Sequence, residues 1–176
     1  LVDGAAARLG RQRLHMVDSR NSADLVFDRV RVPATSLLGN EGEAAATIER
    51  VLDVGRIMLA AEMFGLAQQA FETTLDYLRQ RQQFGVVIGT FQALKHRAVA
   101  MYEEIELSRS VLYEAWSALD EGRDRDIARL ASVCKAKLND TAHLVTNEAI
   151  QLHGAIGMTD AADVGLYIKR ARVAQQ

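Results

Sequence analysis

The stretch from Arg81 to Gln92 gathers side chains that can bind phosphate, form hydrogen bonds and stack on a flat ring. An arginine guanidinium is a forked donor that matches phosphate oxygens, and glutamine amides both donate and accept hydrogen bonds. Aromatic rings offer apolar faces, and glycines let a backbone approach a ligand closely. The residues concerned are Arg81, Gln83, Phe84, Gly85, Gly89, Phe91 and Gln92. A phosphate-bearing cofactor would use all these groups, but they also suit an ordinary turn between helices with a solvated arginine.

A second glycine-rich joint runs from Gln151 to Gly157, where a later helix is expected to end. One glycine is enough to terminate a helix, yet this joint has two, Gly154 and Gly157. The extra glycine indicates that the backbone approaches another group closely. His153 belongs to no metal-binding pattern of the HExxH or Cys/His kind, so we expect no metal site.

Asp53 and Arg56 form a third pair of interest, because they lie three residues apart on a predicted helix and therefore on one face. An exposed ion pair of little energetic weight is the default interpretation of such a pair. Gly55 stands between them, and a gap there would leave room for a ligand.

The elements that must position these residues change character near residue 40. Residues 13–17 and 24–32 are short, β-branched and alternating, as strands are. Turn-forming residues 18–22 separate them, and Pro33, the only proline, is expected to end the second strand. Two strands cannot hold a fold alone, so residues 1–40 are expected to be the end of a larger β domain.

Residues 41–176 are expected to form a mainly α domain, an antiparallel four-helix bundle. Apolar residues recur there at helical spacing, and no proline interrupts them. The first helix should span about 42–80, with Asn40 and Glu43 as its capping box. The residues expected on its inward face are Ile48, Val51, Leu52, Leu59 and Leu66.

The later helices have clearer boundaries. Thr90 and Asp124 are the expected caps of the second and third helices, and Gly122 and Gly154 should end them. A fourth helix should follow, capped by Thr159 or Asp160. The expected inward faces are Leu94, Ala98, Met101, Ile105, Leu112, Ala115 and Leu119, then Ile127, Leu130, Cys134, Leu138, Val145 and Ala149.

The composition is that of a globular protein, with 49% hydrophobic residues and a net charge of −2. This charge argues against a general nucleic-acid binder, and no apolar run approaches the roughly 20 residues of a membrane span. Cys134 is the only cysteine, which excludes an intrachain disulfide and fits a reducing, cytoplasmic compartment. The chain starts at Leu1 without an initiator Met or a signal peptide, so we expect it to begin partway into a longer protein.

Taken in order, these motifs resemble the acyl-CoA dehydrogenase family. The resemblance rests on Arg-x-Gln-Phe-Gly from Arg81, on Phe91-Gln92, and on Gln-x-x-Gly-x-x-Gly from Gln151. Three further stretches resemble that family's last β strands, its substrate-facing helix segment and the turn before its final helices. They are residues 24–33, 52–56 and 157–160. The resemblance covers the whole chain and implies the end of the central β domain (1–40) followed by the C-terminal helical domain (41–176).

The resemblance implies a flavoprotein that binds FAD and introduces a trans double bond between the α and β carbons of an acyl-CoA thioester. Electrons would then pass to an electron-transfer flavoprotein or a similar acceptor. Arg81 would lie at the FAD pyrophosphate, near Gln83, Phe84, Phe91 and Gln92, and Gln151, Gly154 and Ala155 would line the adenosine end. Asp53 and Arg56 would face the thioester. In relatives these elements reach a neighbouring subunit's FAD, which implies a homo- or hetero-oligomer (dimer or tetramer), in the cytoplasm or a mitochondrial matrix.

The catalytic base is not identifiable in this chain. Most relatives place a glutamate just beyond the segment that matches residues 169–176, and a second branch places it at the position of Gly55. Some carry a glutamate where this chain has Ala161, and Ala155 replaces a family glycine. Two hypotheses stay open: an active dehydrogenase whose base lies beyond Gln176 or on a partner, and a non-catalytic subunit that completes a neighbour's FAD site. A third, a cofactor-free helical scaffold, leaves both glycine joints unexplained.

Overall fold

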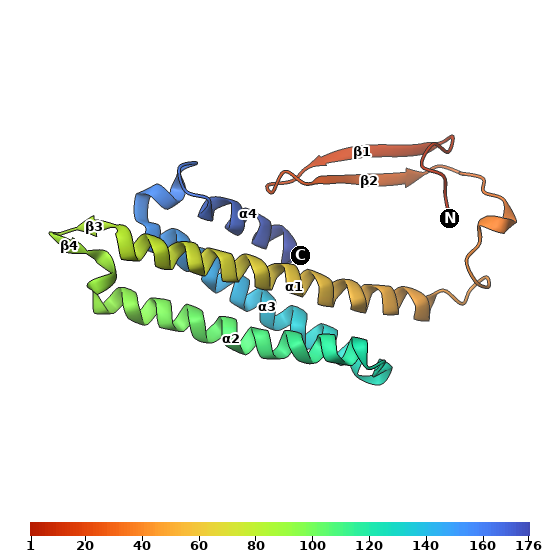
Figure 1. The fold of residues 1–176 in the computed structure, drawn as a ribbon. Coiled ribbons are helices and arrows are strands. Elements are labelled where there is room, and N and C mark those ends of the chain that lie inside the picture. The colour runs from red at the N-terminus through yellow and green to blue at the C-terminus, as the bar shows by residue number, and fades with distance from the viewer. The chain divides into compact units, whose positions relative to one another are not determined.

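The computed structural model describes all residues from Leu1 to Gln176 and divides them into two compact units, Leu1–Val51 and Leu52–Gln176 (Figure 1). The first unit holds an antiparallel hairpin of β1 (Leu9–His15) and β2 (Asn21–Phe27), with Leu9 opposite Phe27 and His15 opposite Asn21. The short 3-10 helix η1 (Ala34–Ser36) follows it. No residue of this unit is fully buried within the chain.

The two expected strands exist, but their predicted bounds were wrong. The first lies several residues earlier than 13–17, and the second ends at Phe27 rather than at Val32. Arg29 adopts a positive φ of 52°, which turns the chain away from β2 well before the proline. Pro33 instead precedes η1. The alternation of Val30 and Val32 therefore marks an extended connection and not a strand.

The second unit confirms the expected four-helix bundle, which Figure 1 shows with its three long helices side by side. The helices are α1 (Ala45–Gln80), α2 (Gln92–Asp120), α3 (Asp124–His153) and α4 (Val164–Ala174), and α1 begins in the first unit. A small hairpin of β3 (Gln82–Gln83) and β4 (Val86–Val87), then the 3-10 helix η2 (Ile88–Thr90), connects α1 to α2. The 3-10 helix η3 (Gly154–Met158) follows α3. None of the helices is both long and apolar enough to cross a membrane.

The predicted inward faces of α2 and α3 are largely confirmed, but three of the five residues predicted for α1 were wrong. Leu59 and Leu66 are half-buried, and Leu59 packs against the core. All six predicted residues of α3 are buried, and so are the central four predicted residues of α2. On α1, Ile48, Val51 and Leu52 are exposed, whereas the buried face is lined by small or polar residues together with a few large ones. These are Asp53, Ile57, Ala60, Met63, Ala67, Ala70, Phe71, Thr74 and Leu78. Alanines bring helix axes close together, so they mark the buried face of α1 better than its largest apolar residues do.

The glycines predicted to end helices lie where expected, whereas the residues predicted to cap the helix N-termini do not act as caps. Gly122 and Gly154 adopt φ values of 66° and 67° just past α2 and at the end of α3, as expected. The capping box at the start of α1 does not form, because the Asn40 amide donates to the Glu43 side chain instead. Thr90 lies within η2, and Asp124 is the first residue of α3 rather than its cap. The last helix begins only at Val164, after Asp163.

Candidate functional site

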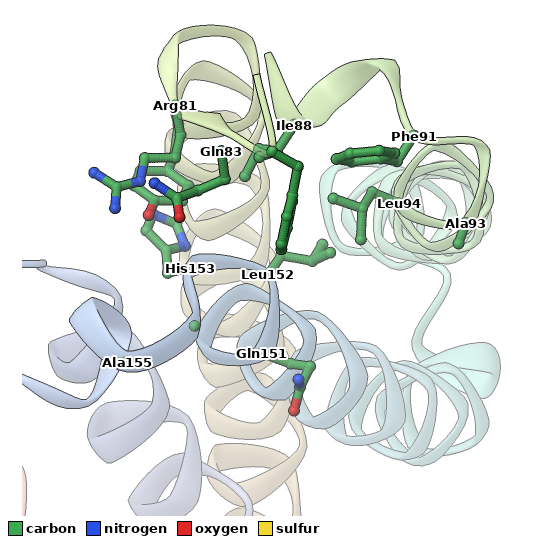
Figure 2. Close-up of a pocket in the computed structure, with 13 residues that line it drawn as sticks. Arg81, Gln83, Ile88, Phe91, Ala93, Leu94, Gln151, Leu152, His153 and Ala155 are labelled. Carbon is green, nitrogen blue, oxygen red and sulfur yellow. The ribbon is translucent and has the colours of Figure 1, made fainter. Parts of the chain in front are cut away.

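A pocket of about 710 Å³ brings the two glycine-rich joints together. Its walls come from the end of α1, the β3–β4 hairpin with η2, the start of α2 and the end of α3. In Figure 2, Arg81 and Gln83 extend from the left of the view, Phe91 lies on the right, and the Gln151 joint lies below them. Of the eight residues predicted to contact a cofactor, seven line this pocket. They are Arg81, Gln83, Phe84, Phe91, Gln151, Gly154 and Ala155.

The eighth residue, Gln92, does not line the pocket; it is the exposed first residue of α2. Six lining residues were missed as site residues: Tyr77, Ile88, Ala93, Leu94, Leu152 and His153. A signal for two of them was present in the sequence. Tyr77 lies four residues, one helical turn, before Arg81, which directly follows α1, and His153 directly precedes Gly154.

The β3–β4 hairpin holds Phe84 in a strained conformation at the pocket. The hairpin pairs Gln82 with Val87 and Gln83 with Val86, so Phe84 and Gly85 form its two-residue turn. Their φ values are 57° and 79°, as in the type I′ turn that matches the twist of a hairpin. A bulky residue rarely adopts a positive φ, which costs on the order of 1–2 kcal/mol. The hairpin thus displays an aromatic ring that is 89% exposed.

A second ring supports this exposed aromatic side chain. Phe91, the residue before α2, meets Phe84 edge to face, with ring centroids 6.0 Å apart and an angle of 72° between the planes. Both rings line the pocket. They offer it an apolar wall against which a flat ring can pack.

Two of the four glycines at the joints serve packing within the chain. The close approach expected at Gly157 is confirmed, and at both Gly89 and Gly157 the group approached is the chain's own backbone. A Cβ at Gly89 would lie 2.7 Å from the carbonyl oxygen of Leu78, and one at Gly157 would lie 2.9 Å from that of Ile150. Gly85 and Gly154 differ, because both have positive φ and no atom lies within 4 Å of the Cβ position. Only these two leave open space beside the backbone.

The charge of the pocket favours an anion. Arg81 is exposed and forms no ion pair within the chain, so its guanidinium donors are available. No aspartate or glutamate lines the pocket. The start of α2 contributes Ala93 to the lining and has no side-chain cap, and the first N–H groups of a helix attract negative charge.

Asp53 and Arg56 form the expected ion pair, but it is more buried than a surface pair. Arg56 Nη1 lies 2.6 Å from Asp53 Oδ1, and Asp53 is only 7% exposed. The space expected beside Gly55 is present, since no atom lies within 4 Å of its Cβ position. Neither charged residue belongs to the pocket that contains Arg81.

Two other groups have roles in the core rather than in chemistry. Cys134 is fully buried, and burial raises the pKa of its thiol to about 11, so it packs as a small apolar residue, as predicted. No group of three or more His, Cys, Asp or Glu side chains is arranged to hold a metal ion.

Residues 42–176 match the family model of the acyl-CoA dehydrogenase C-terminal domain. The chain is 32% identical to the short-chain specific acyl-CoA dehydrogenase of Megasphaera elsdenii over 159 residues, which are 90% of this chain and 41% of that protein. The chain therefore spans about two fifths of the length of this curated relative.

Two solved structures show the same fold. Butyryl-CoA dehydrogenase from Megasphaera elsdenii superposes with a TM-score of 0.93 at 29% identity, over 99% of this chain and 46% of that one. The steroid ACAD Tcur3481-Tcur3483 superposes with a TM-score of 0.83 at 31% identity, over 98% of this chain and 45% of that one. The helical bundle and the hairpin before it are both within the matched part.

Proposed function

Because this chain belongs to the acyl-CoA dehydrogenase family, we propose that it is the C-terminal portion of an FAD-dependent enzyme that dehydrogenates an acyl-CoA thioester between its α and β carbons. In this proposal residues 1–40 close a β domain and residues 41–176 form the helical domain. The observation that carries the proposal is the convergence of Arg81 and Gly154, with five other predicted residues, on one pocket.

The residues of the pocket fit the adenosine diphosphate part of FAD. A pyrophosphate needs cationic donors, and Arg81 has no competing ion pair within the chain. Gly154, with open space beside its backbone, and Ala155 can admit a sugar or a base. The amides of Gln83 and Gln151 supply further donors and acceptors. We place Gln92 at the outer rim, where it would contact only a part of the cofactor that extends beyond the pocket.

When bound, FAD supplies the acceptor for the hydride that leaves the β carbon of the substrate. Asp53 and Arg56 contribute on the substrate side in this proposal. The buried carboxylate of Asp53 holds the half-exposed guanidinium of Arg56 at 2.6 Å, which orients the remaining donors of Arg56. Electrons would leave through an electron-transfer flavoprotein or a similar acceptor.

The chain has no general base at the two positions where some relatives carry a glutamate. Gly55 has no side chain to accept a proton, and Ala161 is likewise inert. Neither position can therefore take the proton from the α carbon, and the residue that does so in this proposal is not identified. A missing general base typically lowers the rate by about 10²–10⁴-fold.

A second candidate function follows from the lack of a general base at these positions. The chain would be a non-catalytic subunit of a hetero-oligomer and would complete a neighbour's FAD site. The open space beside Gly55, where a second branch of the family places its base, favours this candidate. Both candidates require the pocket around Arg81 to bind FAD.

Two measurements test the proposal and separate the candidates. Flavin fluorescence titrated with the whole protein that carries this chain, together with any protein that copurifies with it, measures FAD binding, which both candidates require; no binding at any protein concentration contradicts both. Reduction of an artificial electron acceptor is then followed with acyl-CoA thioesters of different lengths, with the chain alone and with any protein that copurifies with it. Turnover that depends on a second polypeptide supports the subunit candidate, and turnover by the chain's own polypeptide supports the first.

A further inference from the structure

Tyr77 and His153 form an ordered polar pair within the pocket that carries Arg81. Their rings stack with centroids 4.4 Å apart and an angle of 22° between the planes. Both residues line the pocket, and His153 is only 6% exposed. Figure 2 shows His153 below the side chains of Arg81 and Gln83. The stack holds the imidazole in one orientation, since rotation about χ2 would disturb the contact with Tyr77.

The hydrogen bond of His153 to the backbone fixes the proton on its ring. Nδ1 lies 2.8 Å from the carbonyl oxygen of Ala149, one turn earlier in α3. A carbonyl oxygen can only accept a hydrogen bond, so Nδ1 must carry the hydrogen. In the neutral imidazole the other nitrogen, Nε2, is then a hydrogen-bond acceptor.

Nε2 of His153 has no hydrogen-bond partner within the chain and is not fully buried. It is therefore accessible, and the pocket is the cavity that His153 lines. An ionised phosphate oxygen has no proton to donate to Nε2 and would be repelled by its lone pair. A ligand N–H or O–H group, in contrast, can donate a hydrogen bond to Nε2.

We propose that Nε2 of His153 accepts a hydrogen bond from the adenosine part of the bound cofactor, and that Tyr77 is the positioning residue that keeps the imidazole in place. The proposal rests on the proposed binding of FAD. Adenosine offers two kinds of donor, the 6-amino group of adenine and the hydroxyls of ribose. The two residues then have different roles: Arg81 binds the negatively charged phosphates of the cofactor, and His153 accepts a hydrogen bond from the adenosine beside them.

The test compares His153→Phe with the wild-type chain. Phenylalanine keeps a ring for the Tyr77 stack and removes both nitrogens. ADP and FAD affinities are measured by isothermal titration calorimetry, and the expected loss is about 3- to 10-fold, as for one neutral hydrogen bond. His143→Phe is the matched control, because His143 lies exposed on the same helix and outside the pocket. It should bind both ligands like the wild type.

Ligand analogues distinguish the two sources of the donor. IDP replaces the 6-amino donor by a carbonyl acceptor, and 2′-deoxy-ADP and 3′-deoxy-ADP each lack one hydroxyl. The analogue that lacks the bonded donor should bind the wild type more weakly than ADP does, and the H153F variant no more weakly. If all the analogues bind the wild type as ADP does, the acceptor role is wrong.

Nitrogen-15 NMR of the wild-type side chain provides a readout that does not depend on the variant's folding. The His153 resonances should show the Nδ1–H tautomer, and ADP should shift the Nε2 resonance. An Nε2–H tautomer or a doubly protonated ring in the complex overturns the proposal, as does equal affinity of H153F and the wild type for ADP. Failure of the wild type to bind either ADP or FAD overturns the proposed function, and the acceptor role with it.

Discussion

Arg97 of α2 and Glu148 of α3 form a two-pronged ion pair, with Nε 2.6 Å from Oε2 and Nη2 3.0 Å from Oε1. The hydrogen bond to Glu148 raises the pKa of Arg97 above its ordinary value. The pair ties the first turns of α2, which carry Ala93 and Leu94, to the last turns of α3. It therefore connects two helices whose ends contribute residues to the pocket.

Removal of this pair should lower the stability of the chain. Because the pair is only partly buried, Arg97→Ala should reduce the free energy of unfolding by about 1 kcal/mol. Urea denaturation of the R97A, E148A and double variants measures the coupling energy, which should be at least about 0.5 kcal/mol. Arg79→Ala is the control, since the Arg79–Asp76 pair is 3.4 Å long and highly exposed. A coupling energy near zero would show that the pair does not hold the two helices.

Alanine substitutions should distinguish a glycine that is required for close packing, Gly89, from one that is not, Gly65. Gly89→Ala should destabilise the chain by about 1–3 kcal/mol, because its Cβ would lie 2.7 Å from a backbone oxygen that cannot move freely. Gly65→Ala on α1 should stabilise it by up to about 1 kcal/mol, because no atom lies within 4 Å and alanine favours a helix. Thermal unfolding of the two variants checks the opposite signs. Equal effects would mean that the close approach of Gly89 to Leu78 is not maintained.

The turn at Phe84 should show a conflict between stability and binding. Phe84→Asn creates the Asn-Gly pair that type I′ turns prefer, so the free energy of unfolding should rise by about 0.5–1 kcal/mol. Little burial is lost, because Phe84 is 89% exposed. The affinity for FAD should fall, since an aromatic wall of the pocket disappears. A variant that is less stable than the wild type would refute the strain at this turn.

Cys134 should make stability fall at high pH. Burial raises the pKa of its thiol from 9.0 to about 11, so between these values the unfolded chain loses a proton that the folded chain retains. Unfolding then releases protons, and the free energy of unfolding should drop by up to about 1.4 kcal/mol per pH unit between pH 9 and 11. Chemical denaturation of the wild type and of Cys134→Ala at several pH values isolates this slope. Identical slopes would exclude a contribution from Cys134.

The sequence was most informative where one physical signal dominated. Helix α3 carries a single apolar stripe, so its buried face could be predicted residue by residue. Helix α1 has apolar residues on more than one face, and Val51 and Leu52 were chosen although Ile57 and its neighbouring alanines form the core. Periodicity cannot decide between two stripes when the partner helices are unknown.

The candidate site shows a similar division. The joints at Arg81 and Gln151 were expected from their residue types to bind a phosphate-bearing cofactor together, and the family resemblance identified that cofactor as FAD. His153 was dismissed because it had no metal-binding pattern, although its place beside Gly154 put it in the same pocket. Its backbone hydrogen bond and its stack with Tyr77 depend on distances that spacing along the chain does not reveal.

The affinity of Arg81→Ala for FAD, measured by flavin fluorescence, tests the central claim most directly. A charge-assisted hydrogen bond contributes roughly 1.5–3 kcal/mol, so the variant should bind FAD about 10- to 150-fold more weakly than the wild type. Arg79→Ala, which removes an exposed arginine two residues earlier and outside the pocket, should bind FAD normally. If Arg81→Ala and the wild type bind FAD with the same affinity, Arg81 does not hold the cofactor, and the pocket has been assigned the wrong ligand.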